Sequence, residues 1–166
     1  MRDKTSNDRL QLLHPAIRQK AIDACNEADA ALTGKAILRI AYTLRTFAEQ
    51  SDLYAQGRTK AGKIVTNAKA GYSYHNFAFA FDIVLLIDRD NNGTYETASW
   101  QTDADLDADG KADWMEVVEI LKKHGFVWGG DFKSFKDLPH FEMTLGYTTA
   151  QLRAMKKDNK GYVVLP

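Results

Sequence analysis

The sequence contains a single cysteine, Cys25, among its 166 residues. One cysteine excludes an internal disulfide and every zinc motif that is built from several cysteines. Its Ala-rich helical surroundings predict a small core residue. An excess of charge is also missing, because 22 basic residues balance 22 acidic ones. Without a basic excess to neutralise phosphates, we do not expect a nucleic-acid partner.

Long apolar runs are absent as well. No stretch approaches the ~20 apolar residues of a membrane-spanning helix, and the longest run, residues 77–87, is interrupted by Asp82. The polar start, Met1 to Thr5, lacks the apolar segment of a secretory signal. We therefore expect a soluble protein with no membrane span and no signal peptide.

The composition is that of an ordinary globular protein, with 45% hydrophobic and 27% charged residues. The length fits one domain over residues 1–166. Apolar spacing predicts helices over residues 15–32, 46–55, 112–124 and 148–157, and strands over residues 36–42, 78–87, 126–128, 140–143 and 162–165. This mixture predicts an α+β fold, with helices packed on a small, mainly antiparallel sheet.

Two predicted features bear on function. The strand over residues 78–87 is apolar on both faces apart from Asp82, so we expect it at the centre of the sheet. Residues 57–72 hold three glycines, three lysines and an arginine among small polar residues. We expect them to form an irregular loop.

Two short segments carry the side chains that a catalytic metal needs. The first runs from Ser73 to Asp82 and contains His75, and the second contains Asp137 and His140. A catalytic zinc takes three His or carboxylate ligands, keeps a fourth position open, and works beside a base. His75, Asp82 and His140 supply such a ligand set, with Asp137 close to the last ligand.

The spacing of the first two ligands constrains the structure. His75 and Asp82 are seven residues apart, so on one continuous strand they would face opposite sides of the sheet. Both can bind one metal if His75 lies in the loop before the strand, which the turn-forming residues 71–73 favour. An unpaired Asp82 inside an apolar strand would cost several kcal/mol (~2 or more), so it needs a partner. Taken singly, a His or Asp in a strand is more often a hydrogen-bonded core or edge residue than a metal ligand.

Together the motifs resemble a known family. Residues 73–82 (SYHNFAFAFD) resemble the Ser-x-His-x-x-Gly-x-Ala-x-Asp signature of the zinc D,D-carboxypeptidase and L,D-endopeptidase family, which cuts peptidoglycan stem peptides. Residues 137–140 (DLPH) resemble its second signature, an acid followed by the last zinc ligand. Residues 44–50, 54–67 and 128–132 resemble the endolysin-like branch, and the likeness covers about residues 8–145.

The resemblance implies a role for each matching residue. His75, Asp82 and His140 would hold zinc, and Asp137 would act as the general base. One position departs from the pattern, because Ala78 stands where the signature has glycine. If that position needs a positive φ, alanine would cost about 1 kcal/mol, without removing a ligand.

Two further residues have two interpretations each. The resemblance implies that Arg45 stabilises the developing oxyanion, a role suited to a permanent cation. Its spacing alone fits a surface ion pair with Glu49, four residues on. Ser73 either contacts the substrate or orients a ligand, or it only forms the turn before His75.

The predicted function is zinc-dependent hydrolysis of a peptidoglycan stem-peptide bond. The L-alanyl–D-glutamate bond is the leading candidate. The alternatives are a D-Ala-D-Ala carboxypeptidase and a non-catalytic module of the same fold that binds calcium or the cell wall. The resemblance implies a partner in the cell wall, the stem peptide, and we expect a monomer. A phage-derived enzyme would stay in the cytoplasm until released.

An acidic segment, residues 105–116, matches the calcium-binding loop of an EF-hand at each side-chain ligand position, with glycine at position 6. The preceding residues are a poor entering helix, so a paired EF-hand is not expected. We expect either a single calcium loop between a strand and a helix or a solvated acidic loop. The candidate ligands are Asp105, Asp107, Asp109, Lys111 through its backbone carbonyl, Asp113 and Glu116.

Overall fold

The computed structural model describes all 166 residues and contains one five-stranded sheet. Every pairing in the sheet is antiparallel. Its strands are β1 (Ala36–Tyr42), β2 (Ala80–Ile87), β3 (Thr97–Ser99), β4 (Val127–Trp128) and β5 (His140–Glu142). The order is β1-β2-β5-β4, and β3 also pairs with β2. The predicted central strand is confirmed, because β2 pairs with three neighbours.

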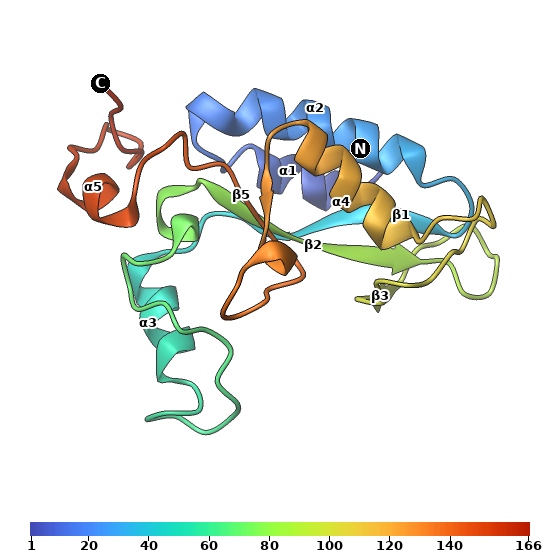
Figure 1. Cartoon of the computed structure of the whole chain (residues 1–166), viewed down its shortest axis with the longest axis horizontal. Coiled ribbons are helices and arrows are strands. Elements are labelled where there is room, and N and C mark those ends of the chain that lie inside the picture. Colours follow the sequence, from blue (N-terminus) through green and yellow to red (C-terminus); the bar gives the residue numbers. More distant parts are fainter.

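Helices cover one face of this sheet, as Figure 1 shows for α1, α2 and α4. The helices are α1 (Lys4–Leu10), α2 (Pro15–Ala31), α3 (Phe47–Ala55), α4 (Asp113–Lys123) and α5 (Thr149–Ala154), with short 3₁₀ turns η1 (Tyr74–Phe77) and η2 (Gly129–Asp131). A core of 25 buried residues, from Leu10 to Val163, lies between the layers and includes Cys25. Both the α+β class and the buried cysteine are therefore confirmed. No helix combines the length and apolar character that crossing a membrane requires.

The structure corrects the sequence analysis near both ends. Residues 162–165 do not form a strand, since Val163 makes only an isolated bridge to Lys157 and no neighbouring strand extends it. Helix α5 ends at Ala154, three residues earlier than expected. Helix α1 was not predicted, because its seven residues show little periodicity. It depends on Asp3, which caps its N-terminus and pairs with Arg39 of β1.

Candidate metal centre

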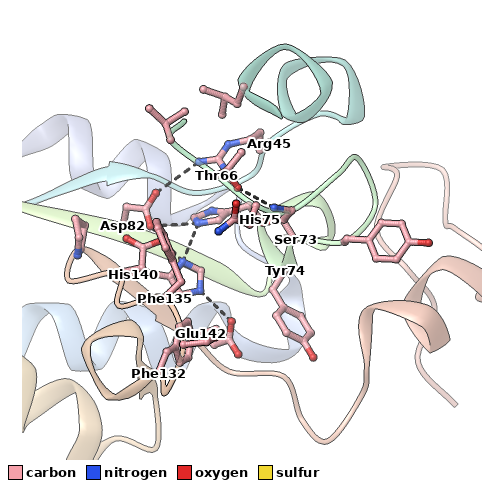
Figure 2. Close-up of a pocket in the computed structure, with 18 residues that line it drawn as sticks. Arg45, Thr66, Ser73, Tyr74, His75, Asp82, Phe132, Phe135, His140 and Glu142 are labelled. Carbon is pink, nitrogen blue, oxygen red and sulfur yellow. Dashed lines mark hydrogen bonds and ion pairs between the residues drawn. The ribbon is translucent and has the colours of Figure 1, made fainter. Parts of the chain in front are cut away.

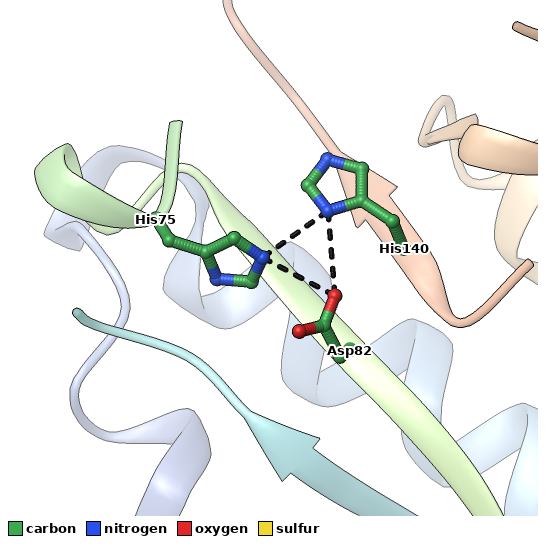
Figure 3. A group of neighbouring side chains, drawn as sticks. All are labelled: His75, Asp82 and His140. Carbon is green, nitrogen blue, oxygen red and sulfur yellow. Dashed lines mark hydrogen bonds and ion pairs between the residues drawn. The ribbon is translucent and has the colours of Figure 1, made fainter. Parts of the chain in front are cut away.

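Three chain segments bring the predicted ligands together. His75 lies in η1, just before β2, Asp82 is inside β2, and His140 opens β5 directly opposite Asp82 in the sheet register. The expectation that His75 precedes the strand is confirmed. The odd spacing is therefore no obstacle, because the 3₁₀ turn carries the imidazole back over the same face of the sheet (Figure 3).

The ligand atoms have a spacing that suits one small cation. His75 Nε2 lies 3.1 Å from His140 Nδ1 and 3.2 Å from Asp82 Oδ1, and His140 Nδ1 lies 3.3 Å from the same oxygen. Ligands about 2.0 Å from a tetrahedral zinc are themselves ~3.3 Å apart. The three residues thus fit zinc, and zinc would occupy the position on which the two nitrogens and the oxygen converge (Figure 3).

Hydrogen bonds fix which nitrogen of each imidazole faces this position. His75 Nδ1–H donates to the Thr43 carbonyl at 2.7 Å, which leaves Nε2 for a metal. His140 Nε2–H donates to the Glu142 carboxylate at 2.9 Å, which leaves Nδ1. Such outer partners orient metal ligands and raise their basicity. Glu142 was not among the predicted site residues, although its position two residues after His140 on a strand places both on one face.

The charges of Asp82 and the two histidines are strongly coupled. Burial acts to raise the pKa of Asp82, but His75 and His140 beside it hold that pKa far below its usual range. Burial acts to lower the pKa of His140, yet the Asp82 and Glu142 carboxylates raise it to about 9. A metal must displace the proton of His140, so metal binding weakens as the pH falls.

Asp137 reaches the site on a tight turn packed against η2. Its backbone N–H donates to the Gly129 carbonyl at 3.0 Å, and Trp128 Nε1 donates to the Leu138 carbonyl at 2.7 Å. A Cβ on Gly129 would stand 2.3 Å from the Asp137 carbonyl oxygen and 3.0 Å from the His140 Cβ. Glycine is required at position 129 because the turn carrying Asp137 and His140 lies directly on its backbone.

The environment of Asp137 suits a proton acceptor. Burial raises the pKa of its carboxyl group, and repulsion from Asp82 raises it further. Asp137 lines the same pocket as the three ligands but does not belong to the group whose ligand atoms lie within 4.8 Å of one another. It therefore sits beside the metal position and outside the ligand set, where a general base is needed.

Arg45 lies on the opposite side of Asp82 from the two histidines. Its Nη2 is 3.6 Å from Asp82 Oδ2, its guanidinium stacks over Tyr42 at 4.8 Å, and its side chain is 12% exposed. The surface ion pair with Glu49 is not formed. Glu49 instead accepts hydrogen bonds from Thr46 and Tyr42. Arg45 is thus a nearly buried cation of the site (Figure 2).

These groups line one open pocket of about 540 Å³ (Figure 2). Ser73 is on its wall, at the start of η1, and its side chain does not cap that turn. Residues 65–68 of the predicted irregular loop also line the pocket, and so do Phe132 and Phe135. The pocket therefore has polar groups beside the metal position and apolar side chains at its rim.

Ala78 has φ 62° and ψ 31°, the left-handed conformation in which glycine is favoured. The departure from the signature therefore places strain at the junction of η1 and β2, as anticipated. The three ligands still converge, so the strain does not disrupt the metal position.

The acidic loop also gathers its carboxylates. Asp105, Asp107 and Asp109 have ligand atoms within 4.8 Å of one another, between β3 and α4 as expected. Gly110 has φ +91°, a sharp turn that favours glycine. Asp113 is buried and accepts from Leu106 N–H at 3.1 Å.

The centre as a whole defines a class of protein. Three His and Asp side chains converge on one position, and a carboxylate of raised pKa and a nearly buried arginine line the same pocket. This is the arrangement of a metal-dependent hydrolase.

Comparison with known proteins identifies the family. A sequence model described as D-alanyl-D-alanine carboxypeptidase matches residues 66–143. The chain is 48% identical over 131 residues to the peptidoglycan L-alanyl-D-glutamate endopeptidase CwlK of Bacillus subtilis (strain 168), covering 79% of this chain and 73% of that protein. The fold matches the L-Ala D-Glu endopeptidase ChiX of Serratia marcescens with a TM-score of 0.53 and 22% identity, covering 86% and 88% of the two chains. The chain belongs to this family of peptidoglycan metallopeptidases.

Proposed function

We propose that this protein is a zinc-dependent endopeptidase that hydrolyses the L-alanyl–D-glutamate bond of peptidoglycan stem peptides. The observation that carries the proposal is the convergence of His75, Asp82 and His140 in a chain 48% identical to an enzyme named for that bond. The complete ligand set, with Asp137 beside it, argues against a non-catalytic module.

Each residue of the site has a chemical task in this proposal. A bound zinc would supply Lewis acidity for the scissile carbonyl and lower the pKa of the attacking water towards ~7. Asp137 takes the proton of that water and delivers it to the departing amine. Arg45 faces the oxygen that becomes negative, and Ser73 contacts the substrate at the pocket wall.

The test is digestion of purified peptidoglycan with and without a zinc chelator, followed by mass spectrometry of the products. Chelator-sensitive cleavage between L-Ala and D-Glu is the expected result. Release of terminal D-Ala alone would instead assign the carboxypeptidase activity that the matching family description names. No cleavage with zinc supplied would leave the non-catalytic module.

We further propose that the acidic loop binds one calcium ion through Asp105, Asp107, Asp109, the Lys111 carbonyl, Asp113 and Glu116. The three clustered carboxylates support this, as does the raised pKa of Glu116, caused by burial and by repulsion from Asp109. Calorimetry should detect binding of calcium. Asp105→Asn with Asp109→Asn should abolish it, whereas Asp103→Asn, an exposed neighbour outside the loop, should not.

We also propose that residues 1–166 form one catalytic domain that acts as a monomer. The single core supports this, because it draws side chains from both ends of the chain, Leu10 and Val163 among them. Light scattering at working concentration should give the mass of one chain, 18.7 kDa. A dimer mass would contradict the second part of this proposal.

A further inference from the structure

Gln50 of α3 is a fully buried polar side chain whose amide group contacts two different parts of the pocket. Its Oε1 accepts a hydrogen bond from Arg45 Nη1 at 3.1 Å. Its Nε2 donates to the Ala68 carbonyl at 2.8 Å and lies 3.5 Å from Thr66 Oγ1. One side chain therefore joins the cation beside the metal centre to the loop that forms the pocket wall.

Arg45 has few other anchors. Its Nε is buried without a hydrogen-bond partner, and its contact with Asp82, at 3.6 Å, is too long for a hydrogen bond. The Tyr42 ring supports one face of the guanidinium but does not fix where its N–H groups point. The hydrogen bond to Gln50 is thus the directional contact that sets the orientation of the Arg45 side chain.

The loop that Gln50 contacts is also held by defined hydrogen bonds. Residues 65–68 line the same pocket as Arg45 and the three metal-ligand candidates. Arg58 braces the same loop by donating to the Thr66 carbonyl at 3.0 Å. The Gln50 amide nitrogen extends this bracing to Ala68, which lines the pocket.

We infer that Gln50 is a positioning residue, which holds Arg45 in the orientation needed at the oxyanion and ties that orientation to the substrate-binding loop. The inference rests on the role proposed for Arg45. An arginine is flexible, and a misplacement of about 1 Å at a reacting centre can cost up to ~100-fold in rate. Gln50 supplies the rigidity that Arg45 lacks.

The first experiment replaces Gln50 with methionine, which has a similar length and no hydrogen-bonding amide. Gln50→Met should lower kcat about 10- to 100-fold and also raise KM, because it removes both the acceptor that orients Arg45 and the donor to the Ala68 carbonyl of the loop. Bound zinc should stay at the wild-type level. Ser6→Ala is the matched control, since Ser6 is a fully buried polar residue bonded to Ile40 far from the pocket. It should lower Tm and leave kcat unchanged.

A double-mutant cycle separates positioning from a merely structural role. Lysine at position 45 lacks the guanidinium group that Gln50 orients. In an Arg45→Lys background, Gln50→Met should therefore lower kcat by less than a further ~2-fold. Additive losses would overturn the inference. If Gln50→Met does not fold, Gln50→Glu carries the test, because it keeps the acceptor for Arg45 and removes the donor to Ala68. The Gln50→Glu variant should have a raised KM and keep its kcat. A lower kcat with an unchanged KM would overturn the inference.

Failure of the inference is distinguishable from failure of the proposed function. Full activity of Arg45→Ala would remove the oxyanion role of Arg45 and the inference with it. Loss of activity in Arg45→Ala together with wild-type kcat in Gln50→Met would overturn the inference about Gln50 alone.

Discussion

His140 and Glu142, two residues apart on β5, are joined by a hydrogen bond of 2.9 Å between Nε2 and Oε2. The carboxylate fixes the imidazole tautomer and turns Nδ1 towards Asp82 and His75. Glu142 is therefore part of the metal centre without being a ligand. The strand geometry that places His140 opposite Asp82 also places Glu142 behind it.

Removing this carboxylate should weaken metal binding. Glu142→Ala should lower zinc affinity about 10- to 100-fold, since outer-shell partners of ligating histidines have effects of that size. Glu142→Gln should lose less, because the amide oxygen still accepts from Nε2–H. Competition with a chromogenic chelator measures the affinity. The control is Glu119→Ala, an exposed acid on α4; equal affinities in all three variants would show that Glu142 does not support His140.

Substituting the base, Asp137, should affect hydrolysis alone, whereas substituting a metal ligand should affect both zinc binding and hydrolysis. Asp137→Asn should lower kcat by ~10²- to 10⁴-fold while bound zinc stays at the wild-type level, because Asp137 moves a proton and does not ligate. His140→Ala and Asp82→Ala should lose both zinc and hydrolysis. Metal analysis beside the peptidoglycan assay checks this. Wild-type activity in Asp137→Asn would exclude it as the base.

The metal-ligand candidates of this centre could be predicted from sequence motifs, but residues that depend on tertiary contacts could not. His75, Asp82 and His140 were predictable as a set, because residues 73–82 and 137–140 match the two signatures of a known family. Gln50 was not, because on a helix it is an ordinary polar residue until the loop at Ala68 packs against it.

The same distinction holds for the fold. The strand β2 is predictable from eight consecutive residues that are apolar apart from one acid. Helix α1 is not, because its stability comes from Asp3 and its contact with Arg39 on β1, 36 residues away. The expected strand over residues 162–165 had the right composition, but its only bridge is the isolated one between Val163 and Lys157.

Calcium should stabilise the protein in a pH-dependent way. Burial raises the pKa of Asp113, and repulsion from Asp107 and Asp105 raises it further, with Glu116 raised similarly. A carboxyl group whose pKa is raised by folding destabilises the folded state above that pKa, and the penalty disappears as the pH falls through it. Bound calcium would offset this destabilisation at a pH where Asp113 and Glu116 are ionised.

The increase in Tm caused by millimolar calcium should therefore be large at neutral pH and shrink at mildly acidic pH. Differential scanning calorimetry of the zinc-loaded protein measures it. The Asp105→Asn, Asp109→Asn variant should show no increase at either pH, and Asp103→Asn should behave as the wild type. An increase that grows on acidification would contradict binding by these carboxylates.

The left-handed conformation of Ala78 predicts that glycine is tolerated better at position 78 than at position 80. An alanine in this region costs ~1–2 kcal/mol relative to ordinary backbone, whereas glycine adopts it freely but loses ~0.4–1 kcal/mol through its more flexible unfolded state. Ala78→Gly also loses a buried methyl group that contributes about 0.8 kcal/mol, so it should change the free energy of unfolding by less than about 1 kcal/mol. Ala80→Gly, in the extended strand β2, should lower it by about 1 kcal/mol.

Both alanines are fully buried, so each variant removes one buried methyl group and the difference between them isolates the backbone conformation. Urea unfolding of the two variants measures that difference. Hydrolysis should be unchanged in Ala78→Gly, because the ligands already converge with alanine in place. Equal destabilisation by both variants would mean that the junction of η1 and β2 carries no strain, and that the missing signature glycine has no energetic consequence.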